Sequence, residues 1–177
     1  MRNLDWLQPL TSLFSSTTIP RIRRNHGLEH ATVTVVSEKL RNLRLSGRAT
    51  ASGFYIYGKI DTEDLTAAVH EALHRLKSGE ARLAVHPNCG TNLVTKGLAA
   101  GLAAYWVLSS ANSTQSKRQR LPQVTLASTL AVLAGQPLGG FLQKHVTTSA
   151  DMGSLRVVDI QRNEQGRFVK HFVSTEE

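Results

Sequence analysis

The stretch GFYIYGKIDTEDLTAAVHEALHRL (53–76) decides the class of fold. Its first part, residues 53–60, is β-branched and aromatic and is bounded by glycines, a pattern typical of a strand. Asp61 then marks the start of a helix. The apolar residues of that helix recur at three- and four-residue spacing: Leu65, Ala68, Val69, Ala72, Leu73 and Leu76. A strand followed directly by an amphipathic helix predicts an α+β domain.

The segments on either side extend this pattern. Residues 25–42 have helical periodicity with Asn25 as the predicted N-cap, and Gly47 is predicted to mark a turn. The sequence ARLAVHP (81–87) is predicted to form a short strand that ends at its proline.

The C-terminal part of the chain contains two more strand patterns. LRVVDIQ (155–161) and RFVKHFV (167–173) flank the turn sequence RNEQG (162–166), which predicts a β-hairpin. We expect this hairpin to complete the sheet of the first half, giving a small mixed α/β domain of the α+β class.

Two long segments between these parts carry no charge. Residues 97–116 and 121–143 contain no Asp, Glu, Lys or Arg, and the basic sequence KRQR (117–120) separates them. A helix that crosses a bilayer needs about 20 mainly apolar residues, and small residues favour close packing of such helices. These features predict a two-helix transmembrane hairpin, with two buried helices of a soluble domain as the alternative.

The predicted hairpin sets the organisation of the chain and its localisation. It gives an integral membrane protein whose two termini lie on the same side, and we expect that side to be the cytoplasm. The four predicted parts are an N-terminal tail or interfacial helix (1–24), an α+β domain with the motif residues (25–92), the membrane hairpin (93–143) and the C-terminal β-hairpin (144–177).

The charge of the chain points to an anionic partner. Lys and Arg number 21 against 13 acidic residues, for a formal net charge of +8. The sequence lacks the interleaved aromatic and basic residues that stack on bases, so membrane lipids are the expected partner rather than nucleic acid. The single cysteine, Cys89, excludes an internal disulfide.

The sequence NHGLEHATV (25–33) contains the first candidate metal site. His26, Glu29 and His30 match H-x-x-E-H, the inverse of the common zinc-protease motif. Residues four apart lie on one face of a helix, so both imidazoles can reach one ion. Glu29 is the residue type that accepts a proton from a water activated by such an ion, which makes it the candidate catalytic base. The alternative is a hydrogen-bonded histidine pair without metal.

Two further motifs contain candidate metal ligands. HEALH (70–74) matches the common zinc-protease pattern, but it lies opposite the apolar face of its helix, which predicts an exposed polar stripe. HPNCGTN (86–92) places His86 three residues before Cys89, and imidazole and thiolate are both good zinc ligands. A tight structural turn is the alternative for this second motif.

Together these motifs predict a zinc centre. His26, His30 and His86 would be ligands, and Cys89 would be the fourth ligand or line the site. Three protein ligands with an open position are the layout of a catalytic zinc site, whereas four are that of a structural one.

HGLEHAT (26–32) and HPNCGTNLV (86–94), with an apolar segment after them, resemble a family of uncharacterised bacterial membrane proteins. That family carries H-G-x-E-H and H-P-x-C-G-T motifs and is often described as predicted metal-dependent enzymes of unsettled activity. A smaller cyanobacterial-type group is similar also in GFYIYG (53–58) and in the C-terminal strands. The resemblance covers residues 25–173 and implies a membrane location and functional roles for His26, Glu29, His30, His86 and Cys89.

The leading hypothesis is therefore a membrane-anchored zinc-binding protein that acts as a metal-dependent hydrolase at the membrane face, on a peptide or an amphiphilic substrate. The alternative is a non-catalytic membrane assembly or accessory protein whose motif residues hold the fold.

Overall fold

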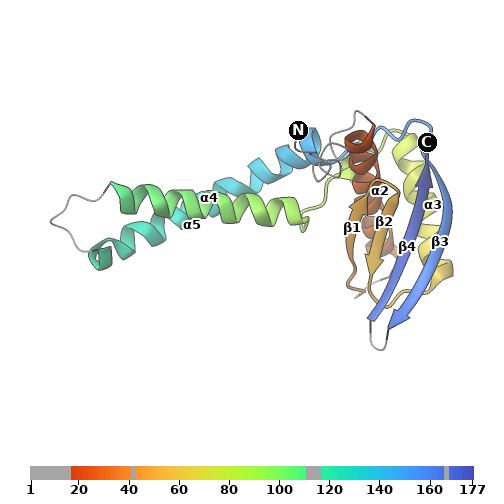
Figure 1. Cartoon of the computed structure of the whole chain (residues 1–177), viewed down its shortest axis with the longest axis horizontal. Helices are drawn as coiled ribbons and strands as arrows, with labels where there is room; N and C mark the ends of the chain where they lie inside the picture. Colours follow the sequence, from red (N-terminus) through yellow and green to blue (C-terminus); the bar gives the residue numbers. More distant parts are fainter. Residues whose placement is uncertain (1–16, 41–42, 111–116, 166–167) are drawn as a thin grey trace, which may run out of the picture. The chain divides into compact units, whose positions relative to one another are not determined.

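A four-stranded antiparallel sheet with the strand order β1-β2-β4-β3 organises one part of the chain in the computed structural model (Figure 1). The structure describes residues 17–40, 43–110, 117–165 and 168–177. The predicted N-terminal interfacial helix falls mostly on residues 1–16, outside the described residues. The chain divides into two units, one formed by Met1–His86 with Thr147–Glu177 and the other by Pro87–Val146.

The first unit contains the sheet and two helices that lie on one of its faces (Figure 1). Its elements are α2 (Thr18–Lys39), β1 (Ser46–Thr50), β2 (Gly53–Tyr57), α3 (Thr62–Lys77), the short 3₁₀ helix η2 (Ala81–Ala84), β3 (Arg156–Gln165) and β4 (Phe168–Glu176). The α+β class is therefore confirmed.

Alternation along the central strands creates the core of this unit. Phe54 and Ile56 of β2 are fully buried, and they pair with Val173 and His171 of β4, which are fully buried as well. Side chains two apart on a strand share a face, so these four lie on the face that the helices cover. The predicted strand in 53–60 and the C-terminal hairpin that completes the sheet are both confirmed.

Helix α2 begins earlier than the sequence predicted. It starts at Thr18, so Asn25 is an interior residue and its assignment as the N-cap was wrong. Asn25 is fully buried; its Nδ2 donates to the Thr50 carbonyl at 2.9 Å, and its Oδ1 accepts from Thr175 Oγ1 at 2.7 Å. These hydrogen bonds connect α2 to β1 and β4. In the sequence, an asparagine with this role cannot be told from one that caps a helix.

Two other local predictions were wrong. Gly47 lies within β1 and not in a turn. Residues 81–84 form η2 instead of a strand, because the consecutive residues Leu83 and Ala84 are both buried, whereas a strand would turn them to opposite faces.

The second unit is a pair of antiparallel helices, α4 (Gly90–Ser109) and α5 (Leu121–Leu142), which run side by side (Figure 1). A 3₁₀ helix, η3 (Lys117–Arg120), precedes α5, and a π-helical turn, η4 (Gln143–Thr147), follows it. The helices approach closely at glycines of α5. A Cβ on Gly139 would lie 2.2 Å from Asn92 Oδ1, and one on Gly135 would lie 3.1 Å from the Lys96 Cα.

One helix in the described part of the chain is long and apolar enough to cross a membrane. It covers Arg118–Thr147; its most apolar 18-residue window has a mean hydropathy of 1.3, and 11% of that window is buried. The sequence predicted two such helices. Helix α4 does not reach this apolarity because Asn92, Thr95 and Lys96 lie in its first two turns.

The glycine contact in the second unit gives a matched pair of variants. Gly139→Ala places a methyl group into Asn92, and we expect it to lower the free energy of unfolding by about 1–3 kcal/mol. Gly140→Ala meets nothing within 4 Å and gains helix propensity, so it should be neutral or stabilising by up to about 1 kcal/mol. Thermal unfolding followed by circular dichroism in detergent measures both. Equal effects of the two substitutions would contradict the close packing.

The buried His171 predicts a loss of stability in mild acid. Its Nε2 lies 3.1 Å from Thr62 Oγ1, and burial, followed by the nearby Arg162, lowers the pKa of His171 from its usual 6.5. Below about pH 6.5 His171 therefore takes up a proton more readily in the unfolded chain than in the folded one, so the free energy of unfolding decreases as the pH is lowered. We expect His171→Asn to reduce this slope in denaturant unfolding between about pH 7.5 and 5.5. His70→Asn, on the exposed side of α3, is the control, and an equal reduction of the slope in this variant would contradict the assignment to His171.

Candidate metal centre

Helix α2 presents the two histidines of the first motif side by side. One turn separates His26 and His30, and their ring centroids are 4.4 Å apart. A ring nitrogen of each lies within 4.8 Å of the other, close enough for both to bind one ion. His30 is buried and His26 is half-buried, so the pair lies at the edge of the core and not on an open helix face.

Backbone carbonyls fix the orientation of both rings. His26 Nδ1 lies 2.9 Å from the Thr147 carbonyl oxygen, and His30 Nδ1 lies 2.9 Å from that of Ala84. A carbonyl only accepts a hydrogen bond, so each Nδ1 must be the donor, and in the neutral ring Nε2 then carries the lone pair. This is the way in which metal-binding histidines are usually oriented, although the same bonds also satisfy a histidine pair without metal.

His86 joins the group from the segment that follows η2. Its ring centroid lies 5.8 Å from that of His30, with the planes tilted by 44°. The histidine of the HPNCGTN sequence thus lies beside the helix that carries the H-x-x-E-H sequence. All three histidines belong to the first unit.

Glu29 turns its carboxylate toward His26. Its Oε2 lies 3.9 Å from His26 Nε2, the atom that the Thr147 contact leaves with a lone pair, and the side chain is almost fully buried. Two ligands of a tetrahedral zinc ion are separated by about 3.4 Å, given ligand distances of about 2.0–2.1 Å. A cation shared by the two atoms, or a proton on His26 Nε2, would satisfy both of them. The sequence alone left the direction of Glu29 open.

Cys89 belongs to the second unit. It is the N-cap of α4, and its Sγ accepts a hydrogen bond from the Thr91 amide at 3.4 Å. Three peptide bonds join it to His86, so the two Cα atoms can be at most about 11 Å apart.

The histidines of the HEALH sequence lie on the exposed face of α3. His70 and His74 are exposed on α3, opposite the buried apolar residues, which confirms the predicted polar stripe. Glu71 points to Lys39 and Arg75 instead. The hydrogen bond from Lys39, together with the charges of both cations, lowers the pKa of the Glu71 carboxyl.

Sequence reasoning missed two glycines that the site requires. A Cβ on Gly47 would lie 2.1 Å from Glu29 Oε1, so the carboxylate occupies the space that any other residue of β1 would fill. A Cβ on Gly27, inside the H-x-x-E-H motif, would lie 2.1 Å from the Ser149 carbonyl oxygen. A glycine within a strand is a signal of close approach, but the sequence predicted a turn at Gly47, so this signal could not be used. The carbonyls of Ala84 and Thr147 left no signal, because a backbone acceptor is independent of residue type.

The Gly47 contact can be tested through its partner. Gly47→Ala should destabilise the fold, because the methyl group and the buried carboxylate compete for one space. In a Glu29→Ala background the same change should cost less, because the competing atoms are gone. A double-mutant cycle on the free energy of unfolding measures this coupling. Additive effects would show that Glu29 does not lie against Gly47.

The comparisons with known proteins agree with the predicted kinship. Residues 21–160 match a family described as a domain of unknown function, DUF6391. An uncharacterised protein of the cyanobacterium Picosynechococcus sp. is 39% identical over 165 residues, which cover 86% of this chain and 78% of the relative. No solved structure matches the chain. The predicted resemblance to an uncharacterised bacterial family is thus confirmed at the level of kinship, and the chain belongs to the DUF6391 family.

Proposed function

We propose that the protein binds a zinc ion through His26, His30 and His86. The observation that carries this proposal is the pair of Nδ1 contacts, 2.9 Å each, to the carbonyls of Thr147 and Ala84. These contacts leave a lone pair on Nε2 of each of two adjacent imidazoles, and imidazole nitrogen is a preferred ligand of zinc. His86 supplies a third imidazole beside His30.

The reaction class that fits this donor set is metal-dependent hydrolysis. A zinc ion held by three protein ligands supplies a Lewis acid that makes water acidic near neutral pH. Glu29 would accept the proton of that water, because its buried carboxylate lies 3.9 Å from His26 Nε2. Gly47 supports this role, since it leaves room for the carboxylate against β1.

The helices α4 and α5 would insert in the membrane as a hairpin. The polar residues that lower the apolarity of α4 are turned inward: Asn92 and Thr95 are buried, and Lys96 packs on Gly135. Close contact at small residues is how helices associate in lipid. The outward side chains are large and apolar, namely Leu93, Val94, Leu98, Leu102, Tyr105 and Trp106 on α4 and Leu121, Leu126, Leu130, Leu133, Leu138 and Phe141 on α5.

This attachment would bring the zinc site to the membrane face. The hairpin leaves the first unit after His86 and rejoins it at Thr147, and both of these residues contact the histidine pair. A peptide or amphiphilic molecule at the level of the lipid headgroups is therefore the proposed substrate. Both termini would lie on one side, which we assign to the cytoplasm from the basic residues of α2.

A non-catalytic accessory role is the second candidate. The same two hydrogen bonds tie α2 to the segments at both ends of the hairpin, through Ala84 on one side and Thr147 on the other. In this reading the histidines hold the fold and the metal, if bound, is structural.

Metal content is the first test. Protein purified in detergent should contain close to one zinc per chain by elemental mass spectrometry. His26→Ala and His86→Ala should lose it, whereas His70→Ala, on the exposed side of α3, should keep it. Cys89→Ser tests the sequence prediction that Cys89 is also a ligand. Folded protein without metal would refute the zinc proposal and favour the accessory role.

Cobalt substitution separates the two functions once metal is bound. A site with an open coordination position should change its visible absorption spectrum when azide is added, as expected for a catalytic centre. A spectrum that azide leaves unchanged would indicate a closed, structural site.

A further inference from the structure

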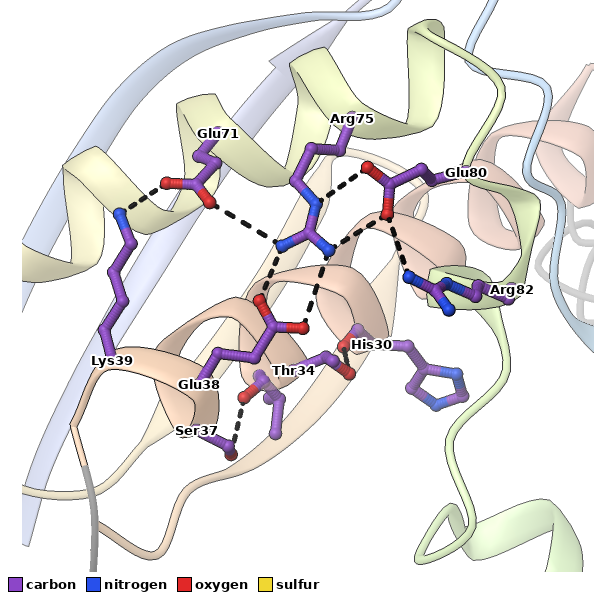
Figure 2. Close-up of polar contacts among 10 residues, drawn as sticks. His30, Thr34, Ser37, Glu38, Lys39, Glu71, Arg75, Glu80 and Arg82 are labelled. Carbon is purple, nitrogen blue, oxygen red and sulfur yellow. Dashed lines mark hydrogen bonds and ion pairs between the residues drawn. The ribbon is translucent and has the colours of Figure 1, made fainter.

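Arg75 of α3 lies among three carboxylates that come from three places in the first unit (Figure 2). Its Nε donates to Glu80 Oε1 at 3.1 Å and its Nη2 to Glu80 Oε2 at 2.9 Å. Its Nη1 donates to Glu38 Oε2 at 2.6 Å, and Glu71 Oε1 is 3.6 Å from the same nitrogen. The Arg75 side chain is 18% exposed, whereas the side chains of Glu80 and Glu38 are 37% and 48% exposed, so the guanidinium is more sheltered from water than its partners are.

Glu80 begins the segment that leads to the proposed zinc site. Residues 80–86 contain η2, the Ala84 carbonyl that accepts from His30 Nδ1, and His86 itself. The segment contains no regular element longer than η2. Its position depends on the burial of Leu83 and Ala84, on the hydrogen bond from His30 to Ala84, and on the contacts of Glu80, whose amide also donates to the Arg75 carbonyl at 3.0 Å.

Glu38 lies on α2, the helix that carries His30. Arg75 therefore joins the start of the 80–86 segment to the helix against which that segment must be placed. Charge alone would not do this, because a planar guanidinium binds two carboxylates in fixed directions whereas an ammonium acts as a point charge. The hydrogen bonds from Arg75 also lower the pKa of the Glu80 carboxyl, which keeps it ionised.

We propose that Arg75 is a positioning residue for the zinc site: its ion pairs with Glu80 and Glu38 hold the 80–86 segment on α2, and so set the Ala84 carbonyl and His86 relative to His30. This inference rests on the proposed zinc binding. It adds a residue from outside both metal motifs, on the helix whose own HEALH sequence binds no metal in our proposal.

Arg82 provides the matched control. It contacts the same Glu80 carboxylate, at 3.7 Å, but its side chain is 82% exposed. Arg82→Ala removes a positive charge near Glu80, whereas Arg75→Ala removes the bridge to α2 as well.

The experiment measures zinc affinity of the full chain in detergent by competition with a chromophoric chelator. We expect Arg75→Ala to weaken binding by about tenfold, the lower end of the effect of a residue that orients metal ligands. Arg82→Ala should stay within about twofold of the wild type, and Arg75→Lys should recover only part of the loss because it lacks the fork. Hydrogen exchange of residues 81–86 in the metal-free protein should rise in Arg75→Ala and not in Arg82→Ala.

The outcomes separate this inference from the function on which it rests. Wild-type affinity in Arg75→Ala would overturn the positioning role and leave zinc binding intact. Full recovery in Arg75→Lys would overturn the role of the guanidinium fork. A folded wild type that binds no zinc would overturn both proposals, and a change in hydrogen exchange would then report only a structural ion pair.

Discussion

The fold depends on one constraint, which is that α2 buries polar side chains together with apolar ones. Asn25, Glu29 and His30 are buried on the same helix as the fully buried Leu28. A buried polar group without a partner costs on the order of 1–3 kcal/mol, so each of them must find one in the elements around α2. Strands β1 and β4 supply the partners of Asn25, and η2 supplies the partner of His30.

The sequence predicts the parts of this arrangement that depend on side-chain patterns, and it does not predict the parts that depend on the backbone. Apolar periodicity in the sequence indicates strand β2, helix α3 and the C-terminal hairpin. Each of them contributes apolar side chains to the core, such as Phe54, Leu65 and Val173. Side-chain spacing also brought His26, His30 and His86 into one hypothesis. What the sequence did not predict are the backbone partners and the space that Gly47 leaves for Glu29, because neither depends on a recognisable side-chain pattern.

The helical hairpin illustrates a different limit of sequence reasoning. By average apolarity, α5 could cross a membrane and α4 could not, although the two helices pack closely against each other. The polar residues of α4 face its partner, so the surface that remains outside is more apolar than the composition indicates. Which side chains a lipid would meet depends on pairing, and pairing is set by small residues such as Gly135 and Gly139.

The Pro87–Val146 unit is inserted between two halves of the sheet-containing unit, and this has a consequence for the order of synthesis. Strands β3 and β4 lie after it, and the contact that ties α2 to β4, from Thr175 to Asn25, joins residues 150 positions apart. The first half of the chain therefore leaves the ribosome with an incomplete sheet, and contacts of this range form late. Thr147, whose carbonyl orients His26, is also made only after the hairpin. If α4 and α5 insert in a bilayer as proposed, the group of histidines would be complete only after insertion, and binding of the proposed zinc ion would follow the arrival of the protein at the membrane.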